Sequence, residues 1–346
     1  MDYIRNTEDR RAVLMDALAD VPLPSVDAER TAALLARCPV AAETPLVASP
    51  ALAEATGVAE VWVKDERGRM GLGSFKALGA AYVIARDAEA GVAKGRTYVT
   101  ASAGNHGLSV AAGAQAFGAN AVVFLAETVP EAFAERLRAY GAEVRRHGAI
   151  YEDAMAGAAE CAETEGWALL SDSSWPGYFE RPHVLMEGYL ALMQEAVAQM
   201  AQAPTHIFLQ AGVGGLAAAC AAYARQAWGD VPRIVVVEPE VAPALFASVV
   251  AGGPQITKGP SSEMGRLDCK EPSLIALKGL ARDADDYVLI SEDEAAMGVD
   301  ACSVAGLPTT ASGGAGVAAL LAGAKVQGVL GLDASSRVML ILSEAA

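Results

Sequence analysis

Short apolar segments alternate along the chain with longer segments in which apolar residues recur at helical spacing. Six short segments are rich in β-branched and other apolar residues and predict strands: residues 61–63, 97–100, 121–125, 207–209, 234–237 and 338–342. In the longest helical pattern one face is apolar and predicts burial; it comprises Met186, Tyr189, Leu190, Met193, Val197 and Met200. Strands that alternate with helices predict an α/β fold with mostly parallel strands.

Chain length and composition narrow the class of protein. At 346 residues the chain is longer than one compact core usually supports, so we expect two domains or one sheet with a large insertion. Hydrophobic residues make up 53% of the chain, yet no run approaches about 20 apolar residues, so no membrane span is predicted. The polar, acidic start of the chain lacks the apolar core of a signal peptide, and we expect a cytoplasmic protein.

Charge and cysteine usage exclude further classes. The formal net charge of −16 would repel a phosphate backbone, so nucleic acid is not an expected partner. The five cysteines are far apart and form no Cys-x-x-Cys pair, so we expect most of them to be buried as small hydrophobic residues. Four dispersed histidines predict no His-rich metal site.

The first segment that could carry chemistry is Gly71-Leu-Gly-Ser-Phe-Lys76-Ala-Leu-Gly-Ala80. A lysine among small and apolar residues would be partly desolvated. Burial disfavours the ammonium, which would lower the pKa of Lys76 and supply the neutral amine that forms a Schiff base. On composition alone, an ordinary surface lysine at a helix start fits the same segment.

The second segment is Thr100-Ala-Ser-Ala-Gly-Asn-His-Gly107, between a predicted strand and a predicted helix. Small residues at a helix N-terminus let backbone N–H groups face an anion, and Ser102 and Asn105 add side-chain hydrogen bonds. The segment therefore fits a carboxylate. It fits an ordinary capped turn between a strand and a helix equally well.

The third segment, Gln210-Ala-Gly-Val-Gly-Gly-Leu216, also follows a strand and precedes a helix. Its glycines would let the backbone surround a phosphate at the helix N-terminus. The same residues fit the dinucleotide pattern Gly212-x-Gly214-x-x-Ala217, and Glu238 lies about where a ribose-binding acid is expected. This segment by itself leaves both a nicotinamide nucleotide and another phosphate open.

Together the three segments resemble the fold type II (tryptophan synthase β-like) family of pyridoxal-phosphate enzymes. The resemblance covers roughly residues 43 to 343 and includes Glu43-Thr-Pro-Leu46, Lys64-Asp-Glu66 and Val237-Glu-Pro239. Within the family the chain is most similar to the diaminopropionate ammonia-lyases, through Ser74-Phe-Lys-Ala-Leu-Gly79, Asp172-Ser-Ser-Trp-Pro-Gly-Tyr178, Met186-Glu-Gly-Tyr189, Pro204-Thr-His206, Leu209-Gln-Ala-Gly-Val-Gly214 and Glu271-Pro272. The resemblance implies two interleaved α/β domains. The large domain, which binds the cofactor, comprises residues 1–84 and 195–346, and the small domain comprises residues 85–194.

The resemblance implies a role for each matching residue. Lys76 would carry pyridoxal 5'-phosphate, and Asn105 would bind the oxygen on its ring. The phosphate would lie against Gly212, Val213, Gly214, Gly215 and Leu216, and the substrate carboxylate against Ser102, Ala103, Gly104, Asn105 and His106. Ser343 would face the pyridine nitrogen; a neutral hydroxyl there makes the ring a weaker electron sink, which favours prompt β-elimination.

The chain departs from the ammonia-lyase pattern at two positions. Ala103 stands where those lyases have an aspartate that is associated with the D-isomer, so this loop looks more like that of a serine or threonine dehydratase. Ser312 stands where many relatives have a glutamate near the cofactor. Asp172, which matches a second lyase aspartate, is retained and is the candidate base for the L-isomer. Asp172 could instead cap the turn before Trp175, and Lys76 would then be the base.

The predicted activity is β-elimination from a small 3-substituted L-amino acid of the 2,3-diaminopropionate type, giving a 2-oxo acid and ammonia. A dehydratase of serine, threonine or hydroxyaspartate is the alternative, and a nicotinamide-dependent oxidoreductase is a remote one. A non-catalytic binder with this fold is a further alternative, because of Ser312. The expected partners are a small amino acid and, from the resemblance, a second copy of the chain in a homodimer. Finally, Gly214→Asp is expected to weaken cofactor binding far more than the fold.

Overall fold

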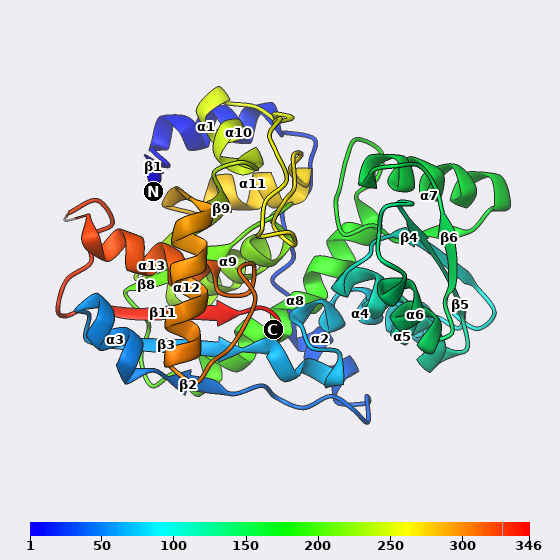
Figure 1. The fold of residues 1–346 in the computed structure, drawn as a ribbon, viewed down its shortest axis with the longest axis horizontal. Helices are drawn as coiled ribbons and strands as arrows, with labels where there is room; N and C mark the ends of the chain where they lie inside the picture. The colour runs from blue at the N-terminus through cyan, green and yellow to red at the C-terminus, as the bar shows by residue number, and fades with distance from the viewer. Residues whose placement is uncertain (327) are drawn as a thin grey trace.

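The computed structural model describes residues 1–326 and 328–346 and contains two sheets, each flanked by helices (Figure 1). The larger sheet has the strand order β1-β10-β9-β8-β11-β3-β2, and the smaller one the order β6-β5-β4-β7. The strands are β1 (Asp2–Arg5), β2 (Leu46–Ala48), β3 (Glu60–Asp65), β4 (Thr97–Ala101), β5 (Asn120–Leu125), β6 (Glu143–Arg146), β7 (Ala168–Leu169), β8 (His206–Gln210), β9 (Arg233–Pro239), β10 (Asp286–Ile290) and β11 (Arg337–Leu342).

Helices cover both faces of each sheet, as a mostly parallel sheet requires. The longer ones are α1 (Glu8–Ala17), α2 (Ala28–Leu35), α3 (Pro50–Thr56), α4 (Ala80–Glu89), α5 (Asn105–Phe117), α6 (Glu131–Ala139), α7 (Tyr151–Glu165), α8 (Glu180–Gln199), α9 (Gly215–Trp228), α10 (Ala244–Ala251), α11 (Leu274–Asp283), α12 (Glu292–Val304) and α13 (Ala315–Lys325). Two 3₁₀ turns, η1 (Glu66–Gly71) and η2 (Phe75–Leu78), follow β3.

The predicted α/β fold with mostly parallel strands is confirmed. In the larger sheet the five inner strands are parallel and the edge strands β1 and β2 are antiparallel, while every pairing in the smaller sheet is parallel. All six predicted strands are present. The pattern missed β1, β2, β6 and β7, which are short edge strands with exposed or half-exposed positions, and it also missed the buried inner strand β10.

Successive side chains along a strand point to opposite faces of the larger sheet, so the sheet separates two hydrophobic cores. On β9, Ile234 and Val236 face one core, whereas Val235 and Val237 face the other. The first core extends without a break to Tyr98 of the smaller sheet. The two sheets are therefore joined by packed apolar side chains rather than by a linker alone.

Helix α8 connects the two sheets. Its predicted apolar face is confirmed, since Met186, Tyr189, Leu190 and Met193 are buried and only its last two positions are half-buried. A Cβ at Gly188 would lie 2.2 Å from the Leu78 carbonyl oxygen. Only glycine lets α8 approach the η2 turn this closely, and η2 carries Lys76. The predicted domain boundaries at residues 84 and 195 fall inside α4 and α8, and the division into two domains stays a prediction.

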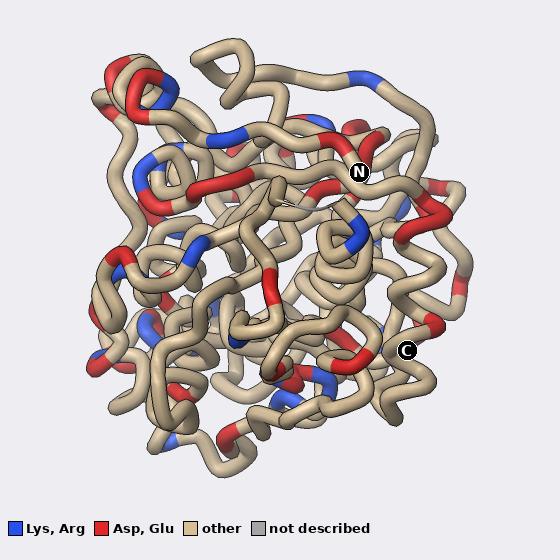
Figure 2. Tube along the Cα trace, turned by 90° about the vertical axis from the view of Figure 1, so that its left-hand side faces the viewer, with Lys and Arg blue, Asp and Glu red and all other residues tan. Residues whose placement is uncertain are grey.

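The distribution of charges and cysteines completes the description. Acidic positions outnumber basic ones, 42 to 26, and Figure 2 shows both kinds scattered over the chain trace. Two cysteines, Cys220 and Cys302, are buried and the other three are half-buried, so the expectation that most are buried is wrong. In the part of the chain that the structure describes, no helix is long and apolar enough to cross a membrane.

Candidate active site

A cavity of about 1090 Å³ lies between the two sheets, where β4, β8 and β11 end. Parallel strands present their carboxyl ends at one edge of a sheet, and the loops that follow them form the usual binding crevice of an open α/β sheet. The cavity walls come from the turn η2, the loops after β4, β7 and β8, the end of β11, and the long connection between α10 and α11. All three candidate segments of the sequence meet here.

Lys76 and Asp172 form an ion pair inside this cavity. Lys76 Nζ donates to Asp172 Oδ2 at 2.5 Å, and their side chains are 21% and 19% exposed. The lysine comes from η2, and the aspartate comes from the loop after β7, 96 positions later in the chain. Lys76 is thus not an ordinary surface lysine. The Asp172 carboxylate pairs with it instead of capping the turn before Trp175.

The ion pair corrects the expected ionisation of Lys76. Burial lowers the pKa of this ammonium, as expected, but the Asp172 carboxylate more than offsets burial and holds the pKa above its usual range. Burial likewise raises the pKa of Asp172, but Lys76 and then His106 outweigh it and hold that pKa well below its usual range. Without a bonded cofactor, the pair is an ammonium and a carboxylate.

Residues 102–106, which are predicted to bind the substrate carboxylate and are called the carboxylate loop below, lie on the wall beside this pair, at the N-terminus of α5. Ser102 Oγ accepts from the Gly104 backbone N–H at 3.2 Å and so shapes the loop. The buried His106 ring bonds through Nε2 to the Leu170 carbonyl oxygen at 2.9 Å. Burial lowers its pKa, which favours the neutral ring. The predicted residues Ser102 to His106 all line the cavity.

The glycine turn after β8 forms the opposite wall. A Cβ at Gly212 would lie 2.9 Å from Cys269 Sγ, and Gly214 has φ +98° at the N-cap of α9. The first intrahelical bond there runs from Ala218 N to the Gly214 carbonyl oxygen. The N–H groups ahead of it lie at a helix N-terminus, where backbone donors favour an anion, and all five residues of the predicted phosphate turn line the cavity.

Two residues at the end of β11 close the cavity floor. The predicted Ser343 is buried and lines the cavity, and its carbonyl oxygen accepts from Phe75 N at 3.1 Å. Its neighbour Glu344 also lines the cavity and accepts a hydrogen bond from the Asn105 side chain. Ser312 does not line the cavity; its hydroxyl accepts from Arg266 N at 3.0 Å.

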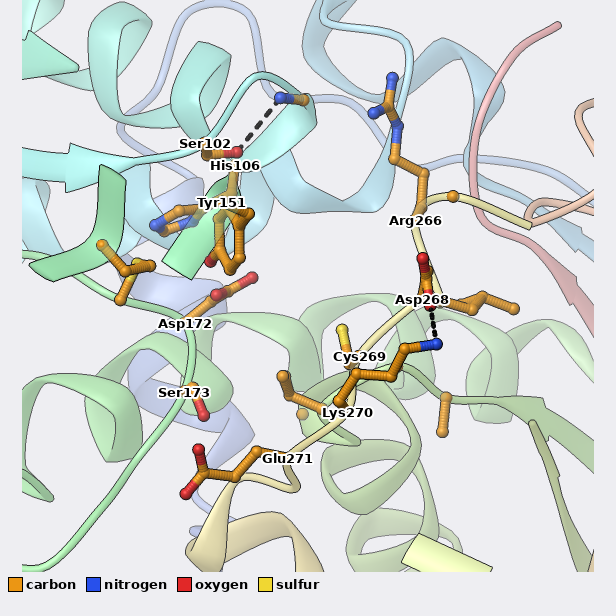
Figure 3. Close-up of a pocket in the computed structure, with 18 of the residues that line it drawn as sticks. Ser102, His106, Tyr151, Asp172, Ser173, Arg266, Asp268, Cys269, Lys270 and Glu271 are labelled. Atoms are coloured by element: carbon orange, nitrogen blue, oxygen red, sulfur yellow. Dashed lines mark hydrogen bonds and ion pairs between the residues drawn. The ribbon is translucent and has the colours of Figure 1, made fainter. Parts of the chain in front are cut away.

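The sequence patterns missed one complete wall, which is the connection between α10 and α11. Figure 3 shows that this chain segment faces Ser102, His106, Tyr151 and Asp172 across the cavity; its labelled residues are Arg266, Asp268, Cys269, Lys270 and Glu271. Asp268 and Lys270 pair at 2.6 Å. The only signal for this wall was Glu271-Pro272, because an irregular segment has no periodicity. The position of Glu344 directly after a parallel strand could have identified that residue.

Two conspicuous sequence features lie outside the cavity lining. The carboxylate of Glu238 accepts from the backbone N–H groups of Leu245 and Phe246, at 2.8 and 2.7 Å, at the start of α10. It is thus used as a helix cap and does not lie where a ribose would bind. The buried Lys64 pairs with Glu195 of α8 at 2.6 Å, so the Lys64-Asp-Glu66 segment ties β3 to α8.

Within residues 1–326 and 328–346, no group of three or more His, Cys, Asp or Glu side chains is placed so that it could hold a metal ion.

The model of one protein family, described as pyridoxal-phosphate dependent enzyme, matches residues 39–344. The chain belongs to this family. This membership confirms the predicted fold type II architecture and the predicted cofactor, pyridoxal phosphate. The remote alternative, a nicotinamide-dependent oxidoreductase, is set aside.

Individual relatives extend the family assignment. A diaminopropionate ammonia-lyase of Salmonella typhimurium is 32% identical over 89% of this chain and 86% of its own length. A crystal structure of the Escherichia coli enzyme of that name, in complex with an aminoacrylate-PLP azomethine reaction intermediate, has a TM-score of 0.83 and 27% identity, and covers 99% of this chain and 93% of that one. A threonine dehydratase of Solanum lycopersicum is 35% identical over 62% of this chain and 33% of its own length.

The cavity residues fit pyridoxal phosphate. The group needs an amine for its aldehyde, an anion site for its phosphate and polar partners for its ring. The cavity offers Lys76 as the amine. As the anion site it offers the turn at Gly212, which packs so closely that a Cβ there would collide with neighbouring atoms. It offers Asn105 and Ser343 as polar side chains between them.

Proposed function

We propose that this protein catalyses pyridoxal-phosphate-dependent β-elimination from a small 3-substituted L-amino acid of the 2,3-diaminopropionate type. The products are a 2-oxo acid and ammonia. The observation that carries the proposal is the 2.5 Å pair of Lys76 and Asp172, placed in the cavity between the carboxylate loop and the glycine turn. Similarity to diaminopropionate ammonia-lyases over most of the chain supports this substrate class.

Each wall of the cavity has a task in this proposal. Bound pyridoxal phosphate supplies an electron sink for the pair of electrons left on the substrate α-carbon when its proton is removed. Lys76 Nζ holds the cofactor covalently, and residues 212–216 bind its phosphate through the N-terminus of α9. Asn105 would donate to the ring oxygen, and the Ser343 hydroxyl would be the partner of the ring nitrogen. This hydroxyl leaves the ring uncharged more readily than a carboxylate would.

The substrate contacts involve the other wall and the acidic member of the ion pair. Backbone N–H groups of residues 102–106 bind the substrate carboxylate and so orient the α-carbon. Asp172, whose pKa is held low by Lys76 and His106 against the effect of burial, is ionised at neutral pH and accepts the α-proton on a carboxylate oxygen. Lys76 is the alternative acceptor. Residues between 256 and 271 line the cavity as well.

A dehydratase of a β-hydroxy amino acid is the second candidate. Ala103 favours it, because this loop position carries a methyl group and no carboxylate that could bind a substrate ammonium. The similarity to a threonine dehydratase supports it as well. Serine, threonine and hydroxyaspartate are the substrates to compare.

Product stoichiometry separates the two candidates. The holoenzyme is incubated with L-2,3-diaminopropionate, L-serine, L-threonine, hydroxyaspartate and 3-chloroalanine, and both ammonia and 2-oxo acid are measured. Diaminopropionate should release two ammonia molecules for each 2-oxo acid, one as the leaving group and one by hydrolysis of the product enamine. A hydroxy amino acid should release one. Failure of every substrate, including chloroalanine with its good leaving group, would contradict an elimination enzyme and favour a non-catalytic binder.

The glycine turn gives a test of phosphate binding. The change Gly214→Asp is not a suitable test of phosphate binding. The φ of +98° at Gly214 and a Cβ only 3.0 Å from Ala276 would strain the fold of any variant at this position. Val213 lines the same turn and already carries a Cβ. We expect Val213→Asp to weaken pyridoxal-phosphate binding at least about tenfold relative to Val213→Asn, because the two side chains match in shape and only one repels a phosphate.

The measurement is the dissociation constant of the cofactor for each apoprotein, together with the melting temperature of each apoprotein. The Asn variant controls for the loss of the valine side chain. Equal affinities of the Asp and Asn variants would mean that the phosphate binds away from residues 212–216.

The assembly and the compartment also remain predictions. We infer a cytoplasmic homodimer from the sequence and from its family. Light scattering of the purified holoenzyme measures the mass in solution, and a monomer at micromolar concentration would contradict the dimer.

A further inference from the structure

Glu344 is a buried carboxylate to which the proposed roles give no task. Its residue is 6% exposed, and it follows β11 directly after Ser343. An isolated bridge pairs it with Ser74, two residues before Lys76. Its carboxylate thus lies beside the segment that carries the cofactor lysine, although it is far from Lys76 in sequence.

Three side chains converge on this carboxylate. Thr310 Oγ1 donates to Oε1 at 2.5 Å, Asn105 Nδ2 donates to Oε2, and Arg266 Nε lies 3.7 Å from Oε2. Thr309 Oγ1 also donates to the Glu344 carbonyl oxygen at 2.6 Å, which fixes the backbone. Side chains from α5, from the loop before α13 and from the α10–α11 connection therefore fix one rotamer of Glu344.

The contact with Asn105 determines which way its amide points. A carboxylate only accepts hydrogen bonds, so the amide atom that faces Glu344 must be the NH₂ group. An NH₂ group has two hydrogens, and Glu344 takes one of them. The other remains for a partner in the cavity, which Asn105 lines. A carboxylate at this point also places negative charge next to that donor.

We infer that Glu344 is a positioning residue for the cofactor: it holds the Asn105 amide with its N–H toward the cofactor ring oxygen, and its charge adds to that of Asp172, 2.5 Å from Lys76 Nζ, in favouring a proton on the lysine–cofactor linkage. The inference rests on the proposed role of Asn105. A nearby anion opposes a second negative charge on the ring oxygen and favours a proton on the linkage nitrogen. Thr310 orients the carboxylate through its hydrogen bond, and the Arg266 guanidinium, 41% exposed and 3.7 Å away, offsets part of its charge.

The test is the visible absorbance of the resting holoenzyme, recorded without substrate between pH 6 and 10. In Glu344→Gln the charge is lost, and the amide of glutamine can present either N or O to Asn105. We expect the midpoint of the pH-dependent absorbance change to fall by about one unit or more, a size typical of losing one nearby charge in a partly buried site. Where the wild type shows only the protonated spectrum in this range, the variant should acquire a midpoint within it.

Two further variants keep the test decisive. Thr310→Val leaves the carboxylate in place but frees one oxygen, and it should shift the midpoint in the same direction by a smaller amount. This variant carries the test if Glu344→Gln does not fold. Glu240→Gln removes an exposed carboxylate that does not line the cavity and should leave the spectrum unchanged.

Identical spectra of wild type, Glu344→Gln and Thr310→Val at every pH would overturn the inference. A shift in the opposite direction would overturn it too. Because no substrate is present, this result is independent of the product assay. A failure of the elimination proposal and a failure of the Glu344 assignment are therefore distinguishable.

Discussion

Lys76→Ala is expected to abolish turnover, because removal of the amine leaves no covalent attachment for the cofactor at the centre of the cavity. The matched variant is Lys76→Arg. It keeps a cation opposite Asp172, which pairs with Lys76 at 2.5 Å, but has no amine that can bond the cofactor. We expect both variants to be inactive, with the arginine variant retaining more of the native stability, since an unpaired buried carboxylate is destabilising. Product assays and melting temperatures of the two proteins are the measurements.

The same assignment predicts where the cofactor is attached. Borohydride reduction of the holoenzyme should fix the cofactor to the peptide that contains Lys76. Two other lysines line the cavity, Lys258 and Lys270, and provide the internal comparison. Lys270 is engaged by Asp268 and two backbone carbonyl groups. Recovery of the label on either of these lysines would show that the Lys76 assignment is wrong.

Asp172→Asn is expected to lower kcat for the L-substrate by about 10²-fold or more, the size that removal of a general base usually produces. Asn preserves the shape of Asp172 but cannot accept the α-proton. In the protein without cofactor, Lys76 and then His106 hold the pKa of Asp172 low against the effect of burial, so its carboxylate is ionised at neutral pH. Asp87→Asn is a matched control, because Asp87 is also ion-paired and similarly exposed, 22% against 19%, but lies outside the cavity lining.

Stereoselectivity is part of the same prediction. Ala103 cannot accept a proton, so the face of the substrate on that side lacks a carboxylate base at this position of the loop. We expect elimination from the L-isomer to exceed elimination from the D-isomer clearly in side-by-side assays. Comparable rates for the two enantiomers would refute the selectivity, and an Asn variant with nearly normal kcat would assign the proton transfer to Lys76.

The fold was largely predictable because its strands carry local signals. The inner strands are continuous apolar runs separated by helical patterns, and this regularity is enough to predict a parallel α/β protein. The edge strands β1 and β6 were not predicted, because a half-exposed edge strand needs few apolar residues. The domain boundaries expected at residues 84 and 195 stay a prediction, and the core that contains Tyr98 and Ile234 continues across both sheets.

The candidate site was predictable only where a backbone conformation leaves a trace in the sequence. The glycine turn at residues 212–216 and the small-residue loop at residues 102–106 are local structures, and short segments determine them. The family resemblance assigned roles to Lys76 and Asp172 but did not predict their contact. Burial predicted a lowered pKa for Lys76, whereas the tertiary structure supplies the carboxylate that reverses the direction.

The sequence by itself determined the six strands with the strongest apolar signal, the two small-residue turns proposed to bind anions and the family, because each is encoded in residues that are neighbours along the chain or recur at fixed spacing. The tertiary structure alone decided which charges meet. Lys76 reaches Asp172 across 96 positions, and Asn105 reaches Glu344 across 239. Such contacts depend on how parallel strands are ordered in the sheets, and strand order is set by packing of the whole chain rather than by any local segment.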